Sequence, residues 1–317
     1  MPAATSTVRL AAGVVAYNEA GNIRAALRSL LDQELPAGAR WGTIWVVASG
    51  CTDGTAEAAR TVDPRVEVLE EPVRRGKSAA LVEVFRRAQG DYLVLLNADA
   101  RAEPGAIAEL LRRGRELAPP FAIMGRPVPP ATGRRGFADA VRLLWEIHHQ
   151  FHAVVLERGQ GTHLSDELLL LPLSDLPPVE PGVVNDGAFL GAWLSTVRGR
   201  LAYAPDARVE IQVPEELRDH VWQRRRIVFG HSQVREILGV RPTTLGPFAL
   251  RHPGAAVRLL VRSVRSTPRG LRALVRLTTA ELVAGLLARW DRIPPRRDHT
   301  LWVRVGERSP SRERTAP

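Results

Sequence analysis

Cysteine and long apolar runs are nearly absent from this sequence, and each absence excludes a class of protein. Cys51 is the only cysteine among the 317 residues, so an internal disulfide framework is excluded and the composition fits a reducing compartment. The longest charge-free apolar stretches, such as residues 41–52, fall well short of the ~20 residues that a membrane-spanning helix needs. Residues 1–10 hold no apolar segment typical of a signal peptide. We therefore expect a cytoplasmic protein, in solution or peripheral at the inner face of the plasma membrane.

Lysine is almost absent as well, because Lys77 is the only one and arginine supplies the remaining basic side chains. The net charge is +10, and it is unevenly spread. Residues 218–317 contain 21 arginines and 7 acidic residues, a net charge of +14, which leaves −4 for the rest of the chain. This asymmetry favours a polyanionic partner, either a membrane surface or a nucleic acid. A compositional preference for arginine would give the same bias without a partner, and both explanations stay open.

The basic tail has neither interleaved aromatic residues nor a recognisable nucleic-acid module, which argues against nucleic-acid binding. Its arginines recur at spacings of four and three, which places them along one helix face: Arg258, Arg262, Arg265, Arg269, Arg272 and Arg276. Pro268 and Gly270 should divide this segment into two helices. Leucine and valine are expected on the opposite face, where they would either insert into an anionic membrane surface or pack back on the rest of the protein.

The first 125 residues alternate between apolar runs and helical patterns, as a doubly wound α/β sheet does. Four apolar runs read as strands that helices bury on both faces: residues 10–17, 43–48, 66–69 and 92–96. Helices are predicted after them, over residues 22–33, 55–60, 77–88 and 104–117. Beyond residue 130 the pattern loosens; helices are expected over residues 137–156 and 214–238, and a strand over residues 203–213.

Polar clusters follow three of the predicted strands at the point where each strand ends. They are Asn18-Glu19, residues 49–53 and residues 97–99. In doubly wound sheets the ligand lies beyond the carboxyl ends of the strands. The sequence therefore predicts one crevice at which these three loops converge.

Three carboxylates are candidates for binding and chemistry. Asp53, in a turn at a strand end, can accept a hydrogen bond from a base or a ribose, or it can cap the helix that begins near Thr55. Asp99 directly follows a buried strand and can bind Mn²⁺ or Mg²⁺; such ions typically take one or two protein carboxylates and complete their coordination with phosphate and water. Asp186 can act as a general base on an acceptor hydroxyl, or it can cap the helix that follows it.

Gln223 and Arg226 lie three residues apart on a predicted helix and therefore share one face. Arginine suits a leaving diphosphate because its guanidinium can bind two phosphate oxygens at once. A run of arginines such as residues 224–226 is also typical of a solvated basic face. We expect Gln223 and Arg226 to point together into the crevice.

Other motifs invite functions that their context argues against. His148, His149 and His152 have no cysteine or carboxylate partner at ligand spacing, which argues against a metal site there. Residues 76–78 end like a P-loop but lack its preceding glycine, which argues against an ATPase. Cys51 reads as a packed turn residue rather than a nucleophile.

Six motifs in order resemble the family-2 inverting glycosyltransferases of the GT-A fold, over roughly residues 9–234. They are Ala16-Tyr17-Asn18-Glu19, residues 49–55, residues 76–81, Asn97-Ala98-Asp99-Ala100, Asn185-Asp186 and Gln223-Arg224-Arg225-Arg226. Asn97-Ala98-Asp99-Ala100 stands where the family has its metal-binding Asp-x-Asp. Asn185-Asp186 stands where the family has a Glu-Asp-type base, and residues 223–226 stand where it has Gln-x-x-Arg-Trp. Each motif is weak alone, and their order makes the resemblance specific.

The resemblance implies transfer of one sugar, with inversion, from a UDP- or GDP-linked donor to a hydroxyl acceptor: a lipid-linked molecule, a cell-surface glycan or a small natural product. It implies Asp186 as the general base and Mn²⁺ or Mg²⁺ at Asp99. It further implies donor binding by Asn18, Glu19, Asp53, Lys77, Asn97, Ala98, Gln223 and Arg226.

Two positions depart from the family pattern. Asn97 stands where the family usually has aspartate, so it can hydrogen-bond a ribose but cannot share the charge of a cation. Ile227 stands where the family often has tryptophan, which removes an aromatic wall from the acceptor side. Family members that build long polymers usually keep that tryptophan and add membrane spans. Transfer of a single sugar is therefore expected.

Together these observations predict an α/β fold with a GT-A-type doubly wound, mixed, mostly parallel sheet flanked by helices. Residues 1–127 would bind the nucleotide sugar, residues 128–240 would hold the acceptor and the base, and residues 241–317 would form an arginine-rich amphipathic helical extension with a disordered end. Two alternatives remain. One is a nucleotidyltransferase, although residues 16–19 lack its glycine-rich basic signature. The other is a non-catalytic protein of the same architecture, which Asn97 favours.

Overall fold

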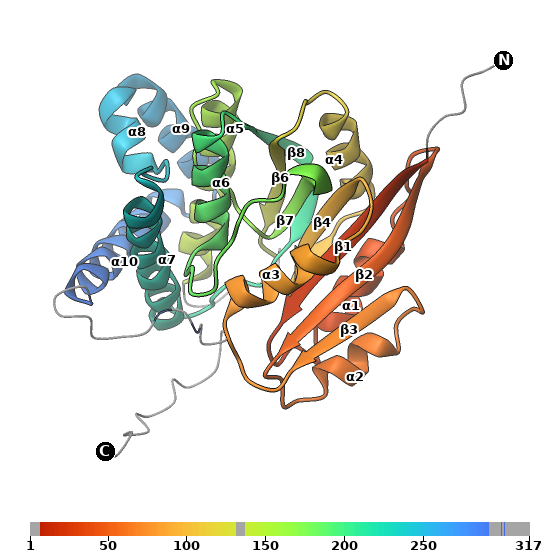
Figure 1. Ribbon diagram of the computed structural model, residues 1–317. Helices are drawn as coiled ribbons and strands as arrows, with labels where there is room; N and C mark the ends of the chain where they lie inside the picture. The colour runs from red at the N-terminus through yellow and green to blue at the C-terminus, as the bar shows by residue number, and fades with distance from the viewer. Residues whose placement is uncertain (1–6, 131–136, 292–298, 300, 302–317) are drawn as a thin grey trace.

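The computed structural model describes residues 7–130, 137–291, 299 and 301. Its centre is an eight-stranded mixed sheet in the order β3-β2-β1-β4-β7-β6-β8-β5 (Figure 1). The half of the sheet formed first along the chain is parallel. It consists of β1 (Val8–Ala16), β2 (Ala39–Ser49), β3 (Val66–Glu71) and β4 (Tyr92–Asn97). These four strands confirm the predicted ones.

The other half of the sheet is mixed, and three of its four strands were not predicted. β7 (Leu168–Pro172) runs antiparallel to both β4 and β6 (Phe121–Val128). β8 (Arg200–Glu210) pairs in parallel with β6 and antiparallel with the short β5 (Arg101–Ala102). The direction of β7 matters for the site, because Leu168 at its start pairs with Leu96 near the end of β4. Residues that precede β7 therefore lie at the rim where the parallel strands end.

Helices cover both faces of the sheet. On one face lie α1 (Ile23–Leu31), α2 (Thr55–Arg60) and α4 (Ala106–Gly114), and on the other lie α3 (Lys77–Arg87) and α6 (Asp186–Thr196). Successive side chains of a strand point to opposite faces, and β1 follows this rule: Leu10 and Ala12 join the core under α1 while Ala11 joins the core under α3. Burial on both faces explains the uninterrupted apolar runs of these strands.

A block of helices stands beside the mixed half of the sheet (Figure 1). It consists of α5 (Ala138–Glu157), α7 (Leu217–Leu238), α8 (Leu245–Arg251), α9 (Pro253–Ser266) and α10 (Gly270–Trp290). α5, α8, α9 and α10 share a third hydrophobic core that includes Phe151, Phe248, Leu259 and Leu277. One face of α9 and α10 therefore packs back on the protein. The break between these two helices falls at Pro268, as predicted.

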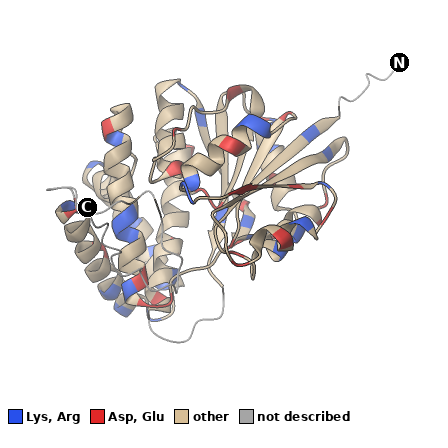
Figure 2. Cartoon of the chain, turned by 60° about the horizontal axis from the view of Figure 1, so that its bottom comes forward, with Lys and Arg blue, Asp and Glu red and all other residues tan. Residues whose placement is uncertain are grey.

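The exposed face of α9 and α10 differs from the expected one, because arginines and apolar side chains share it. On α9, Val257, Arg258, Val261, Arg262 and Arg265 are all exposed. The buried stripe of α10 consists mostly of alanine, so its larger apolar side chains point outward: Leu271, Val275, Leu282, Leu286 and Trp290. Figure 2 shows basic residues recurring along this helical part of the molecule.

No helix among the described residues combines the length and apolar character needed to cross a membrane. The expected disordered end of the chain lies outside the described residues. The division of the chain at residues 127 and 240 remains a prediction.

Candidate active site

A cavity of about 1020 Å³ lies where β1 and β4 end. Its wall brings together seven of the residues that the resemblance implies: Glu19, Lys77, Asn97, Asp99, Asp186, Gln223 and Arg226. Among the described residues that line it, Asn18, Asp53 and Ala98 do not occur. Asp99 and Asp186 thus face one cavity from separate parts of the chain. The expected crevice exists, and Asp53 lies outside its wall.

Asn18 and Asp53 tie together the two loops that follow β1 and β2. Asn18 has a φ of 53°, and its side-chain oxygen accepts a hydrogen bond from Thr52 N–H (2.8 Å). The Asp53 carboxylate accepts hydrogen bonds from Ala20 N–H (3.0 Å) and Thr55 N–H (3.1 Å). Burial acts to raise the pKa of Asp53, but the hydrogen bonds from Thr55 and Ala20 outweigh it and lower the pKa. Both side chains therefore stabilise the loops at the rim through hydrogen bonds to the backbone. Direct contact of either side chain with the donor remains a prediction.

The rim next to β1 carries a buried carboxylate and a stacked arginine. Glu19 is buried, and its Oε2 accepts a hydrogen bond from Asn22 Nδ2 (2.7 Å). The Arg74 guanidinium lies over the ring of Tyr17, 3.5 Å from its centroid. Tyr17 and Arg74 both line the cavity. Arg74 was not expected at the site from the sequence, because a pair of arginines in a loop has no distinguishing pattern.

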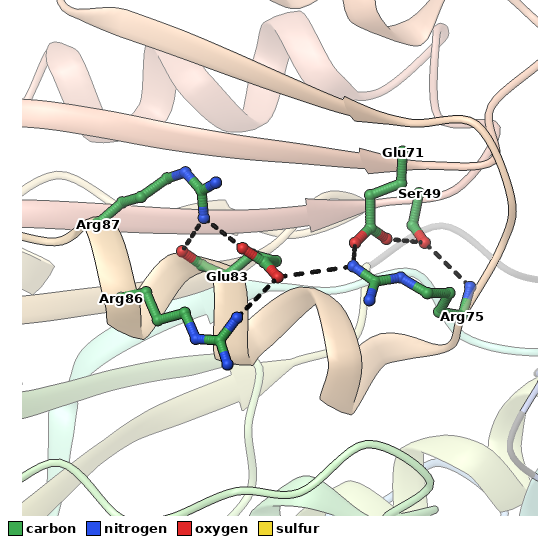
Figure 3. Close-up of polar contacts among 6 residues, drawn as sticks. All are labelled: Ser49, Glu71, Arg75, Glu83, Arg86 and Arg87. Carbon is green, nitrogen blue, oxygen red and sulfur yellow. Dashed lines mark hydrogen bonds and ion pairs between the residues drawn. The ribbon is translucent and has the colours of Figure 1, made fainter.

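A network of charged side chains fixes the start of α3, which carries Lys77 (Figure 3). Ser49 Oγ donates to Glu71 Oε2 (2.6 Å), and Arg75 forms a close ion pair with the same carboxylate. Arg75 also lies 3.6 Å from Glu83 Oε1, on the next turns of α3. The segment that leads into α3 is thereby held against β2 and β3, and Lys77 is directed into the cavity.

Lys77 lies between two carboxylates at the centre of the site. Its Nζ forms a close ion pair with Asp166 and lies 3.1 Å from Asp186 Oδ2. It also donates to Asn97 Oδ1 (2.9 Å). One positive charge therefore faces two negative ones. Lys77 was expected at the donor, and the structure places it where it also controls the charge of the candidate base.

This arrangement separates the pKa values of the two carboxylates. Burial raises the pKa of Asp186, the Asp166 carboxylate raises it further, and Lys77 opposes both, so that the pKa is about 6. Burial acts on Asp166 in the same sense, but contact with Lys77 lowers its pKa below the usual value. A general base works best with a pKa near the working pH. Asp186 meets that condition, while Asp166 remains charged.

The start of α6 leaves the Asp186 side chain available. Asn185 is the helix cap, because its side-chain oxygen accepts a hydrogen bond from Ala188 N–H (2.9 Å). Asp186 is the first residue of α6 and lines the cavity. α7 packs closely here through Gly230, where a Cβ would lie 2.7 Å from Asn185 Cβ. The capping alternative for Asp186 is therefore wrong, because its neighbour does the capping.

Asp166 and Glu167 are the acidic residues that the sequence analysis missed. Asn97 N–H donates to Glu167 O (3.2 Å), which places this pair beside the end of β4. Burial, and then the Asp166 charge, raises the pKa of Glu167 to about 8. An acidic pair directly before the apolar run of residues 168–171 was the available signal. In a parallel sheet only the carboxyl ends of strands lead into the site, and this pair precedes its strand.

Several carboxylates line the cavity, and two of them lie at the end of β4: Asp99, which follows that strand, and Glu167, which lies beside it. Within the described part of the chain, no group of three or more His, Cys, Asp or Glu side chains is placed to hold a metal ion. Mn²⁺ and Mg²⁺ often need only one or two protein carboxylates when substrate phosphates complete their coordination. The residues present fit an ion that is bound together with a diphosphate.

The three consecutive arginines of α7 point in three directions. Arg224 Nε lies 2.7 Å from Glu281 Oε1 on α10. Arg225 is buried and forms a close ion pair with Asp291. Arg226 lines the cavity, as Gln223 does. The solvated basic face is therefore wrong for Arg225. Gln223 and Arg226 both line the cavity, and their contact with the donor remains a prediction.

Comparison with known proteins agrees with this geometry. Residues 12–154, just under half of the chain, match the model of glycosyl transferase family 2. The chain is 34% identical over 148 residues to glycosyltransferase AglD of Haloferax volcanii, a match that covers 44% of this chain and 22% of AglD. This chain therefore matches about a fifth of the length of that relative.

A solved structure extends the likeness to most of the chain. It is the mannosyltransferase PcManGT from Pyrobaculum calidifontis in complex with GDP-Man and Mn²⁺. The TM-score is 0.54 at 21% sequence identity, with 93% of this chain and 83% of that chain covered. The likeness shows that the mixed, mostly parallel sheet and its helices form a GT-A-type fold. Residues 12–154 therefore resemble glycosyl transferase family 2, and the fold of most of the chain is that of a GT-A-type protein.

Proposed function

We propose that this protein is an inverting glycosyltransferase that moves one sugar from a nucleoside-diphosphate sugar to a hydroxyl acceptor. The observation that carries the proposal is that Asp99 and Asp186 line one cavity. Asp99 lies at the end of a parallel strand, where nucleotides bind in such folds. Asp186 faces the same space with its pKa raised to about 6.

The proposed reaction needs one proton transfer and one substitution. The Asp186 carboxylate takes the proton of the acceptor hydroxyl while that oxygen forms a bond to the anomeric carbon. The bond from this carbon to the diphosphate oxygen breaks, and the nucleoside diphosphate leaves with the electron pair. Attack opposite the leaving group inverts the anomeric configuration. The Lys77 ammonium, 3.1 Å from Asp186 Oδ2, orients the base.

The diphosphate would lie between Arg74, Arg226 and the acidic wall. Arg74 and Arg226 line the cavity and can bind phosphate oxygens. Asp99 would hold Mn²⁺ or Mg²⁺, with Glu167 as a second carboxylate once it has lost its proton. A divalent cation supplies positive charge that stabilises the leaving group. The GDP-Man and Mn²⁺ of the Pyrobaculum calidifontis structure support GDP-mannose with Mn²⁺ as the first donor to try, with UDP-linked sugars next.

Donor binding is tested by thermal unfolding of the protein with GDP- and UDP-linked sugars, with and without Mn²⁺. A ligand at about 100 times its Kd stabilises the folded state by about 2.7 kcal/mol. We expect a metal-dependent rise in Tm with one nucleotide class, and loss of its metal-dependent part in Asp99→Asn. The same samples are assayed for slow release of the nucleoside diphosphate. Absence of any shift with every nucleotide sugar would contradict the proposal.

An anionic membrane surface is the proposed partner of the exposed face of α9 and α10. Leu271, Val275 and Leu286 on α10 are 72%, 63% and 67% exposed, and exposed arginines lie beside such side chains on both helices. Apolar side chains at this spacing can enter the headgroup region, while arginine pairs with anionic lipid. No acidic side chain is exposed on α9 or α10 among the described residues. The charge and the apolar area thus favour the same partner.

Vesicle flotation tests this surface in the full-length protein, because α8 to α10 supply part of a hydrophobic core and cannot be removed cleanly. We expect binding to vesicles that contain anionic lipid and much weaker binding by the triple variant Arg258→Gln, Arg262→Gln, Arg265→Gln. The control triple variant is Arg40→Gln, Arg115→Gln, Arg200→Gln, which removes the same charge from exposed positions of the sheet half. If both triple variants lose vesicle binding equally, the effect is one of general charge, and the proposal that α9 and α10 bind the membrane is rejected.

A further inference from the structure

The cavity continues from the sheet rim into the helical block. Its volume of about 1020 Å³ exceeds what one drug-sized ligand usually occupies. The inner part lies between α5, α7 and α10 and is lined by Trp145, Phe151 and Leu277, among other apolar side chains. Four histidines also line it: His148, His152, His163 and His231. We call this part the histidine chamber.

The four histidine rings form a contiguous row. The ring centroids of His148 and His152 are 4.2 Å apart, those of His152 and His163 are 5.9 Å apart, and those of His163 and His231 are 4.9 Å apart. The row starts on α5, passes through the loop before β7 and ends on α7. Neither the nucleotide nor the base requires it, so the proposed reaction leaves it unexplained.

Three of these rings have a buried nitrogen without a hydrogen-bond partner in the described structure: His148 Nδ1, His152 Nδ1 and His231 Nε2. His152 as a whole is only 2% exposed. A buried polar atom that lacks a partner destabilises the folded state. No metal-holding group of three or more side chains exists within the described residues. The three residues line the cavity while these nitrogens are themselves buried, so a ligand would bond to them once the rings have turned toward it.

The charges along the wall of the chamber are balanced, because its histidine rings are neutral and the Arg224 and Glu281 side chains that also line the cavity pair with each other. Burial lowers the pKa of His148 to about 3 and, in the same way, that of His163 to about 4, so these rings are neutral at pH 7. The nearest arginine on α7, Arg224, is paired with Glu281 (2.7 Å). A neutral imidazole offers one donor and one acceptor. Such a wall suits hydroxyl groups on an apolar body and gives no compensation to a phosphate.

We propose that the histidine chamber binds the acceptor of the transfer, and that this acceptor is an uncharged alcohol with a bulky apolar body. The proposal rests on the proposed function and adds the acceptor class to it. Asp186 and the chamber line one continuous cavity, and His163 lies three residues before Asp166, the partner of Lys77, in the same loop. An apolar body in the chamber would bring its hydroxyl to Asp186. The imidazole nitrogens would bind polar groups further along that body.

Binding of three probes by isothermal titration calorimetry tests this class: farnesol, farnesyl phosphate and methyl mannoside. The first is an uncharged apolar alcohol, the second is its charged counterpart, and the third is a polar alcohol. We expect saturable binding of farnesol, at least about tenfold tighter than that of either other probe. Farnesol given free or in phosphatidylcholine vesicles distinguishes a dissolved acceptor from one taken out of a membrane, and tight binding in either form supports the chamber.

Two neighbouring histidines on α5 provide a matched pair of variants. His148→Leu keeps the shape of the chamber but removes the unpaired nitrogen, so we expect a Tm higher by about 2–4 °C and farnesol affinity at least about tenfold lower. His149 bonds to Tyr203 Oη (2.8 Å) and lies outside the described lining of the cavity. His149→Leu should therefore lower Tm and leave farnesol affinity unchanged. His231→Leu is the second chamber variant, in case His148→Leu fails to fold.

Donor binding by the same samples separates this proposal from the proposed function. Normal nucleotide-sugar binding together with no saturable farnesol binding would overturn the chamber proposal alone. Tighter binding of farnesyl phosphate than of farnesol would overturn it as well, since a charged acceptor would then be preferred. Unchanged farnesol affinity in both His148→Leu and His231→Leu would show that the histidines only pack. If the unmodified protein binds no nucleotide sugar, the proposed function itself is contradicted.

Discussion

The sheet rim and the helical block bury charged side chains in different ways. At the rim, one cation, Lys77, faces the two carboxylates Asp166 and Asp186. In the helical block, Arg225 and Asp291 pair one to one in a buried position. The excess negative charge at the rim holds one carboxyl close to its titration point, whereas the balanced pair keeps both charges fixed. A buried ion pair alone thus says little about function; the balance of charge around it says more.

The largest effect is expected where charge is unbalanced, at Asp186. Asp186→Asn keeps the size of the side chain but cannot accept the proton of the acceptor. General base catalysis typically contributes about 10²–10⁴-fold in rate, so we expect kcat for sugar transfer to fall by about that factor. Donor Kd, measured by the thermal-unfolding titration, should stay within about twofold of the unmodified protein. Full activity in Asp186→Asn would show that another group takes the proton and that Asp186 is not the base.

The balanced pair in the helical block should show the opposite behaviour, a large effect on stability. Arg225→Met leaves the buried Asp291 with His299, 2.9 Å away, as its remaining partner among the described residues. Removal of one partner of a buried pair costs about 3–5 kcal/mol. The double variant Arg225→Met, Asp291→Leu should recover most of that loss. Urea unfolding measures both. The exposed Arg112→Met serves as a control, with a loss of less than about 1 kcal/mol; a similar small loss in Arg225→Met would contradict the comparison.

Acid should act on the two regions in opposite directions. The unfolded chain binds protons on histidine below about pH 6.5, whereas the pKa values of His148 and His163 in the folded protein are lowered to about 3 and 4. Their contribution to stability is therefore complete above pH 6.5 and is lost as the pH falls toward 4. The pKa of Asp186 is raised to about 6, so its contribution is complete below its unfolded value near 3.8 and is lost as the pH rises through 6.

Urea unfolding at pH 7 and pH 5 separates these contributions. Each histidine whose pKa is lowered changes the free energy of unfolding by about 1.4 kcal/mol per pH unit in this window. The loss of stability from pH 7 to pH 5 should therefore be smaller by roughly 2 kcal/mol in His148→Leu than in the unmodified protein. In Asp186→Asn the same loss should be larger. An identical pH dependence in all three proteins would show that neither group titrates differently on folding.

The sequence predicted the parallel half of the sheet better than the mixed half, and the reason is physical. β1, β2 and β4 each contain a long apolar run because helices bury both of their faces. β6 contains Gly125 and Pro127, which interrupt the pattern, and its register with β8 shifts between Met124 and Arg126. A strand that tolerates such a break gives no periodic signal. Its place is set by pairing with β7 and β8, which are distant in sequence.

The site shows the same division between local and distant signals. Glu19, Asn97 and Asp99 were found because each follows a predicted strand. Asp166 was missed because β7 is antiparallel, so its amino end, not its carboxyl end, lies at the rim. The ion pairs of Arg224 and Arg225 on α7 could not be predicted from the sequence either. Their partners, Glu281 and Asp291, lie on α10 and directly after it. Contacts of that kind depend on how the helices pack.

The smallest expected effect tests the unbalanced cluster itself, through Lys77→Met. Removal of the ammonium leaves Asp166 and Asp186 facing each other, and like charges that share a buried site raise one pKa strongly. The limb of the kcat/KM profile that rises with pH should therefore move from about pH 6 upward by roughly one unit, because Asp186 must lose its proton to act as the base. At pH 9 the variant should recover much of the activity that it lacks at pH 6. If the midpoint of the kcat/KM profile stays near pH 6, whatever the maximum value of kcat/KM, Lys77 does not set the pKa of the base. The charge imbalance at the rim would then have no catalytic consequence.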